Sequence, residues 1–217
     1  MTEASKNQPS WRAAAREAMQ QATVAEAERR FGTAHPLYNY RWEHVIAVHT
    51  LAMKLAELTG ADEEIVEAAV WLHDVAKDEG DDHPQEGAAF ARDFLPETDF
   101  PPEKIEPVAE AIEQHMGLWR DEPLETLESQ VLWDADKLTK LGLTAAFQWL
   151  GRRFAKGQTL TTRALIDTAE DTEWQSKTVE SLHTDPARRA AARRLATFNK
   201  LWAELETELD GADLTGD

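Results

Sequence analysis

The chain has 217 residues, of which 42% are hydrophobic and 29% charged, a composition typical of a folded globular protein rather than a disordered one. It contains no cysteine, which excludes disulfides, thiolate zinc sites and cysteine nucleophiles. Its net charge of −18 disfavours DNA or RNA as a partner, because the average field repels a polyanion. A small anionic substrate remains possible where metal ions and local cations reverse that field.

The N-terminal segment 1–10 is polar and lacks the apolar core of a signal peptide. No apolar stretch approaches the ~20 residues that a membrane span needs. We therefore expect a cytoplasmic protein without a membrane partner. The acidic composition is interpreted as a solvated surface that keeps the chain in solution.

Helical periodicity runs through most of the chain, and strand-type alternation is absent. The first helix is predicted over residues 10–31, with Ser10 as its N-cap, and the second over 40–58. A third begins near Asp62, a suitable cap, and runs into the step His73-Asp74. The chain up to this step therefore predicts three packed helices.

A charged turn over residues 77–82 separates this part from the next helix, which opens at His83-Pro84 because proline suits the first helical position. Further helices are expected over 101–116, 124–141 and 142–157, and one or two more over 164–212 after a linker at 158–164. We predict an all-α protein, a single helical bundle with flanking N- and C-terminal helices. Its parts are an N-terminal helix and break (1–39), a core (40–142) and C-terminal helices that complete or flank the same domain (143–217).

The most informative feature is the step His73-Asp74, which closes an apolar run at residues 68–72 that must be buried. An ionised carboxylate is costly to bury unless it is paired or bound to metal. Neutral imidazole and carboxylate together bind divalent transition metals. Other candidate ligands return from separate predicted helices: His44, His83, His115, Asp134 and Asp136. The sequence therefore predicts one buried metal site, the alternative being a hydrogen-bonded His-Asp pair without metal.

For three of these candidates, helix geometry predicts where the side chain points. His115 continues the apolar stripe of Ile105, Val108 and Ile112, so it is expected to face the bundle interior. Asp134 and Asp136 lie about 200° apart on a helix, so only one is expected to reach the site. Periodicity does not choose between them, and the other carboxylate is expected to support a ligand or to be exposed.

The order His44, His73-Asp74, Asp136 resembles the HD superfamily of metal-dependent phosphohydrolases, which is named for that doublet. The resemblance covers about residues 40–142, and residues 190–204 look like the C-terminal helix of the small bacterial and archaeal members. Further matching segments are Leu72–Lys77, His83 with Gly87-Ala88, Ala111–His115 and Asp134–Leu138. In that family the aspartate of the Ala-Asp step is the ligand, which favours Asp136 over Asp134.

The resemblance implies one of two ligand sets. Family members with one metal use two His and two Asp, which here are His44, His73, Asp74 and Asp136. Members with a binuclear site add two His from the intervening helices, and His83 and His115 stand at both places; otherwise these two would line the pocket and touch phosphate. The chain lacks the Gly-Tyr-Pro motif of the cyclic-di-GMP enzymes, which argues against that activity.

The resemblance thus predicts an enzyme, a metal-dependent phosphohydrolase acting on a phosphoester or phosphoanhydride, with a nucleotide as the expected substrate. The cofactor is expected to be one or two divalent ions: Mn, Fe, Co, Ni or Mg. Asp74 would hold metal and orient water, and Lys77, His83 or His115 would stabilise charge on the phosphoryl oxygens. The alternative is a non-enzymatic nucleotide- or metal-binding regulator that retains the site. A homodimer is possible.

The remaining polar and aromatic candidates carry weaker expectations. Lys137 and Arg41 are possible phosphate contacts. The other histidines, His35, His49 and His183, are expected in a loop, on a helix flank and on the C-terminal surface. The tryptophans Trp42, Trp119 and Trp133 are expected in the core, and the pairs Arg188-Arg189 and Arg193-Arg194 on a solvated helix face.

Overall fold

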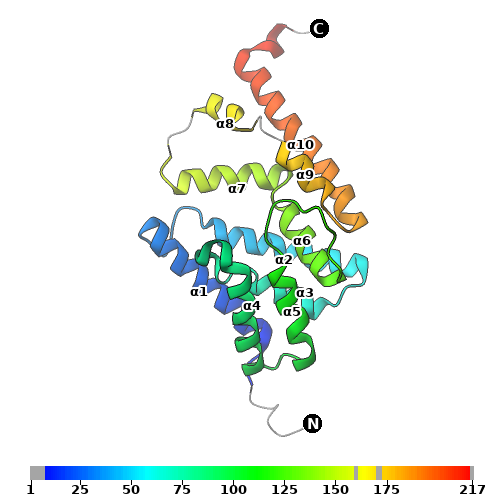
Figure 1. The fold of residues 1–217 in the computed structure, drawn as a ribbon. Helices are drawn as coiled ribbons and strands as arrows, with labels where there is room; N and C mark the ends of the chain where they lie inside the picture. The colour runs from blue at the N-terminus through cyan, green and yellow to red at the C-terminus, as the bar shows by residue number, and fades with distance from the viewer. Residues whose placement is uncertain (1–7, 159–160, 170–172, 216–217) are drawn as a thin grey trace.

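The structure is a computed structural model that describes residues 8–158, 161–169 and 173–215. All regular elements in these ranges are helical, which confirms the predicted all-α class (Figure 1). The α-helices are α1 (Trp11–Phe31), α2 (Tyr40–Thr59), α3 (Glu63–Leu72), α4 (His83–Phe94), α5 (Ile105–Glu113), α6 (Leu127–Leu138), α7 (Gly142–Ala155), α8 (Thr162–Ala169), α9 (Glu173–Glu180) and α10 (Asp185–Asp210). Short 3₁₀ helices span Lys77–Asp82, Leu95–Glu97, Pro102–Lys104 and Ala212–Thr215. None of the described helices is both long and apolar enough to cross a membrane.

The helix starts test the predicted caps. The Asp62 side chain accepts hydrogen bonds from the N–H groups of Glu64 and Ile65, as expected for the α3 cap. Ser10 occupies the N-cap position of α1, but its side chain makes no capping bond to the described residues. Instead the Trp11 N–H donates to Asp99 Oδ1 at 2.7 Å. The predicted position of the cap is therefore confirmed, but a distant carboxylate rather than the Ser10 hydroxyl binds this helix end and ties α1 to the bundle.

The core lies between α2, α3, α5 and α6. Helix α2 packs against α3 and α6, and α5 packs against α3 and α4. Helix α3 is buried along almost its whole length, from Ile65 to Leu72. Each buried Val or Leu contributes about 1.5–3 kcal/mol relative to an exposed one. Because α3 ends inside the bundle, the His73-Asp74 step that follows it begins in the interior.

The C-terminal helices form the upper part of the molecule in Figure 1, where α7 packs on α2 and α10, and α8 and α9 pack on α10. The described part of 164–212 contains three helices rather than the one or two expected, and the predicted helix 124–141 shortens to α6. The predicted linker 158–164 ends early because α8 begins at Thr162; residues 159–160 lie outside the described ranges. Residues 1–7 of the polar N-terminal segment also lie outside the described ranges.

Asp134 joins α6 to the start of α10. Its carboxylate, fully buried, accepts bonds from the His183 N–H (2.8 Å), the Thr184 N–H (2.7 Å) and the Thr184 hydroxyl (2.7 Å). The His183 ring is also buried, and its Nε2 accepts from the Leu124 N–H at 2.9 Å. The predicted surface position of His183 was therefore wrong, because the turn before α10 is held against α6.

Some of the other expected side-chain positions are confirmed, and some are wrong. His35 is exposed in the 32–39 break and His49 lies on a helix flank, as expected. Trp133 is buried and Trp42 packs against the core, whereas Trp119 is 44% exposed, because it lies in the irregular segment between α5 and α6. Of the arginines expected in solvent, Arg188, Arg189 and Arg193 are exposed and Arg194 is half-buried, and two of the four also bind backbone carbonyls. Arg188 donates to Leu182 (2.8 Å) and Arg194 to Leu138 (2.6 Å).

Candidate metal centre

The six predicted ligands meet at one place in the bundle. Each is at most 6% exposed, so the centre is walled by protein. They come from five segments: His44 on α2, His73 and Asp74 after α3, His83 opening α4, His115 after α5, and Asp136 on α6. The single site expected from the sequence is therefore present as a cluster of side chains.

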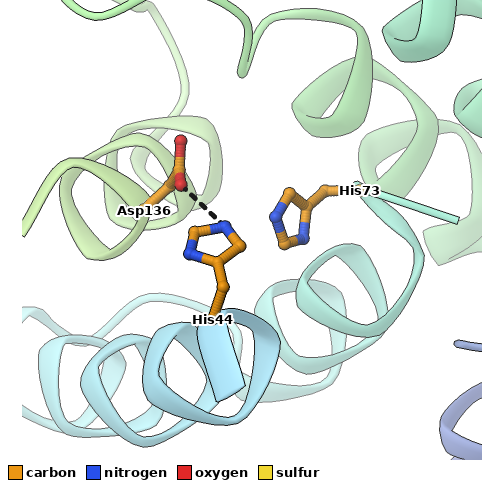
Figure 2. A group of neighbouring side chains, drawn as sticks. All are labelled: His44, His73 and Asp136. Atoms are coloured by element: carbon orange, nitrogen blue, oxygen red, sulfur yellow. Dashed lines mark ion pairs between the residues drawn. The ribbon is translucent and has the colours of Figure 1, made fainter. Parts of the chain in front are cut away.

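The cluster consists of two groups of three potential ligands. In the first triad, His44, His73 and Asp136, one donor atom from each residue lies within 4.8 Å of the others. Figure 2 shows these three side chains converging, with His44 Nε2 3.1 Å from Asp136 Oδ1. In the second triad, Asp74, His83 and His115, one donor atom from each residue likewise lies within 4.8 Å of the others. Each triad offers the three donors with which a divalent ion can be held while open positions remain.

Asp74, a member of the second triad, also faces the first. Its Oδ2 is 3.6 Å from the Nε2 atoms of both His44 and His73. Its Oδ1 is 3.8 Å from His83 Nε2 and 3.7 Å from His115 Nε2. Neighbouring residues on a helix diverge by about 100°, but α3 ends at Leu72 and the doublet lies in the following turn. One carboxylate therefore faces both groups, one oxygen to each.

Three of the imidazoles are oriented by the backbone. The Nδ1 atoms of His73, His83 and His115 lie 2.6–2.7 Å from the carbonyl oxygen three residues earlier. Because a carbonyl only accepts, Nδ1 carries the proton and Nε2 keeps its lone pair. In all three residues Nε2 faces the centre, the arrangement typical of metal-binding histidine, although in His83 this atom lies 2.7 Å from Lys77 Nζ.

The fourth imidazole, His44, is oriented by a residue the sequence analysis did not single out. Its Nδ1 lies 3.2 Å from Thr139 Oγ1, and that hydroxyl donates its own proton to the Asp136 carbonyl at 2.6 Å. Lys140 Nζ also lies 3.3 Å from this Nδ1, so Thr139 and Lys140 together position the ring, while His44 Nε2 faces Asp136 Oδ1 at 3.1 Å. Only the position of Thr139 at the end of α6, beside Asp136, could have indicated this role.

His115 reaches the centre by a different route from the one expected. Helix α5 ends at Glu113, so His115 does not continue the helical stripe. Its N–H donates to the Ile112 carbonyl at 3.3 Å in a tight turn, and the side chain is 3% exposed. The inward orientation is confirmed, whereas the helical position was wrong, because α5 stops before the ligand-bearing turn.

The protonation states suit a divalent cation. Burial lowers the pKa of His44 to about 4 and that of His73 to about 3, so both rings are neutral at pH 7. Burial alone would raise the carboxyl pKa values, but Arg41 holds the pKa of Asp74, and Lys137 that of Asp136, well below the usual range. Neutral imidazoles and ionised carboxylates are the donor set that transition metals take.

Two buried polar atoms without hydrogen-bond partners indicate whether a metal would fit. His73 Nε2 and Asp74 Oδ1 are buried and accept no hydrogen bond from the described residues, although Lys77 Nζ lies 3.2 Å from Asp74 Oδ1 as an ion pair. An unsatisfied buried polar atom costs about 1–3 kcal/mol. A divalent ion in each triad would bind one of these two atoms, so the residues present fit such ions.

Basic side chains hold the two carboxylates in place. Arg41 pairs with Asp74 and also binds Glu26 of α1 at 2.9 Å, which links the N-terminal helix to the centre. Lys137, which is 1% exposed, pairs with Asp136 and donates to the His115 carbonyl at 2.8 Å. This burial makes Lys137 a support for Asp136. Glu26 was missed because its role depends on how α1 approaches α2.

A cavity of about 540 Å³ opens over the centre. Among the described residues that line it are six Lys or Arg and three Asp, so it is locally basic in a chain of net charge −18. The basic residues are Arg30, Arg41, Lys77, Lys137, Lys140 and Arg152. This excess of cations favours an anion beside the two triads.

The fold and the centre define an all-α bundle whose His and Asp ligands come from five segments. Residues 41–141 match the family model of the HD domain. This part of the chain is therefore similar to the HD domain. The matched segment lies inside the predicted core 40–142, and the division of the chain at those borders stays a prediction.

Solved structures give the same fold. YpgQ of Bacillus subtilis in complex with ADP aligns with a TM-score of 0.64 and 21% identity, covering 90% of this chain and 98% of its own. A predicted HD superfamily hydrolase from an uncultured Thermotogales bacterium gives 0.63 and 21%, covering 90% and 91%. An HD-superfamily hydrolase of Bacillus thuringiensis gives 0.59 and 17%, covering 90% and 98%. At these identities the likeness is one of fold.

Proposed function

We propose that this protein is a metal-dependent phosphohydrolase that holds two divalent ions and cleaves a phosphoester or phosphoanhydride bond of a nucleotide. The observation that carries the proposal is Asp74, whose two oxygens face the two triads separately. A carboxylate in that position would help to hold an ion in either group. Mixed imidazole and carboxylate donors favour Mn, Fe, Co or Ni over Mg.

The charges of the site support a phosphorylated substrate. Among the six candidate ligands only the two carboxylates are negatively charged, so two divalent ions would carry more charge than these ligands neutralise. The surrounding cavity is also basic. When bound, such ions polarise phosphoryl oxygens and lower the pKa of a coordinated water. An anionic phosphate is therefore the ligand that the charges of the cavity favour.

The basic side chains near the centre differ in their exposure. The side chains of Arg41 and Lys137 are 9% and 2% exposed and stay with their carboxylates. The Lys77 side chain is 32% exposed, and its Nζ lies 2.7 Å from His83 Nε2. Because Lys77 has a flexible stem and reaches the cavity, it is the residue proposed to turn toward the phosphate and neutralise it. The ADP bound to YpgQ, a protein of the same fold, supports a nucleotide as the substrate.

The test is release of phosphate or pyrophosphate from a panel of nucleoside mono-, di- and triphosphates and dinucleoside polyphosphates with added Mn. We expect turnover by the native protein and its loss, together with the metal, in Asp74→Ala. Asp93→Ala, an exposed carboxylate on α4, is the matched control and should behave like the native protein. A metal-loaded protein that binds nucleotides but turns over none would contradict the proposal and indicate a regulator.

A further inference from the structure

A second pocket of about 300 Å³ lies next to the metal centre, where α7, α9 and α10 meet. We call it the aromatic pocket, because its walls carry Trp149, Trp174, Phe198 and Trp202. The Trp202 ring packs edge-on against Trp149 (6.3 Å, 83°) and Phe198 (5.7 Å, 73°). Aromatic walls of this kind favour a flat apolar ligand, which can stack on a ring face or meet a ring edge.

The pocket also contains polar atoms without partners. Gln148 Oε1, Gln175 Oε1 and Trp202 Nε1 are buried and form no hydrogen bond within the described part of the chain. The two glutamines are only 7% and 2% exposed. Native proteins pair roughly 90% or more of such groups, and each unpaired one costs about 1–3 kcal/mol. Three in one small pocket indicate a ligand that supplies the missing partners.

The orientation of one amide defines what that ligand must offer. Gln148 Nε2 donates to the Glu43 carbonyl at 3.5 Å, so its Oε1 is the atom left as an acceptor. Trp202 Nε1 is a donor only. The ligand must therefore carry at least one N–H or O–H donor and one acceptor on an otherwise flat apolar body. A nucleobase has this combination, whereas an acyl chain would leave all three atoms unpaired.

The aromatic pocket is continuous with the cavity over the metal centre. Tyr40, Lys140 and Arg152 line both. The Arg152 guanidinium lies 5.3 Å and Lys140 Nζ 5.8 Å from the Tyr40 ring, and Lys140 Nζ is 3.6 Å from Asp136 Oδ1. Two cations therefore stand at the junction, where the phosphates of a ligand that spans both spaces would lie.

We propose that the aromatic pocket binds the base of the nucleotide substrate, with Gln148, Gln175 and Trp202 recognising its edge and Lys140 and Arg152 contacting its phosphates. This proposal rests on the phosphohydrolase function and adds the place where the substrate is selected. Stacking of a base on an aromatic side chain is worth about 1–3 kcal/mol, so loss of one wall should weaken binding about 10-fold or more.

The first experiment measures binding without phosphate or metal. Guanosine, adenosine, cytidine and uridine are titrated separately into the native protein, and quenching of tryptophan fluorescence is recorded. We expect saturable quenching by nucleosides and none by ribose. Gln175→Met removes an unpaired acceptor with little change in volume, so it should raise the Kd for the nucleoside at least 5-fold while the midpoint of thermal unfolding stays level or rises. If Gln175 were merely structural, the Kd for the nucleoside would stay unchanged and the midpoint of thermal unfolding would fall.

The second experiment separates this inference from the proposed function. Trp202→Ala should raise KM for nucleotides about 10-fold or more and leave turnover of inorganic tripolyphosphate unchanged; Trp119→Phe, an exposed tryptophan outside the pocket, is the control. Nucleotide hydrolysis with unchanged KM in both Trp202→Ala and Gln175→Met would overturn the base pocket and leave the phosphohydrolase standing. Nucleoside binding without hydrolysis of any phosphate compound would support the pocket and contradict the phosphohydrolase.

Discussion

Asp134 and Asp136 are two residues apart on α6, yet the structure predicts opposite consequences when each is replaced by asparagine. Asp136 faces His44 and His73, whereas Asp134 faces away and holds the turn before α10. Asp134→Asn should therefore lower stability and leave metal binding intact. Asp136→Asn should lose metal.

The size of the Asp134→Asn effect follows from its three hydrogen bonds. The buried carboxylate receives three donors at 2.7–2.8 Å, and each charge-assisted bond is worth about 1.5–3 kcal/mol. Asparagine keeps one oxygen and points its NH₂ group at a backbone N–H, so at least one bond is lost and the others lose the charge. We expect a loss of about 2–4 kcal/mol, which for a chain of this size is a fall of about 5–15 °C in Tm.

The assay combines thermal unfolding with metal analysis of the purified variants. The expected result for Asp134→Asn is a lower Tm and the metal content of the native protein. For Asp136→Asn it is a metal content reduced by half or more. Loss of metal in Asp134→Asn without a fall in Tm would refute the assignment of the two carboxylates.

Three further predictions concern ligand orientation, pH and packing. Thr139→Val should weaken metal affinity about 10–100-fold, measured by competition with a chelator, because it removes one of the two groups that position His44. Burial places the pKa values of His44 and His73 at about 4 and about 3, below the unfolded value of 6.5, so their neutral form stabilises the fold above pH 6.5 and this stability is lost as pH falls. In urea unfolding of metal-free protein, we expect about 1.4 kcal/mol lost per pH unit for each ring between pH 6.5 and 4, and a slope that stays the same in His44→Asn would contradict this. Gly142→Ala should destabilise the protein by at least about 1 kcal/mol in the same urea assay, because φ is +74° and a new Cβ would lie 2.9 Å from the Arg194 side chain.

The side chains that the structure brings together could be selected from the sequence because each stands at a distinctive place in the helical pattern. His73 and Asp74 close a buried run, and His83 precedes a proline that starts a helix, so residue type and position agreed. The choice between Asp134 and Asp136 could not be made from periodicity, since both side chains are buried. It depends on Thr184, which is 50 residues away in the chain and takes Asp134 out of the site.

Other features depend entirely on packing between distant segments. Glu26 supports Arg41 only because α1 lies against α2, and no local pattern distinguishes it from other acids on that helix. The aromatic pocket combines side chains from α7, α9 and α10, which are separated in sequence and show no common motif. Tertiary contacts of this kind form the aromatic pocket, whereas local sequence indicates most of the candidate metal ligands.

The most direct test of the two-metal centre is the number of ions bound per chain, measured by titration calorimetry with Mn and by elemental analysis. We expect two ions in the native protein and one in His115→Ala, with turnover reduced at least ~10²-fold while the helical fold survives. A single ion in the native protein, with His115→Ala still binding that ion, would contradict the central claim and leave a four-ligand site of His44, His73, Asp74 and Asp136.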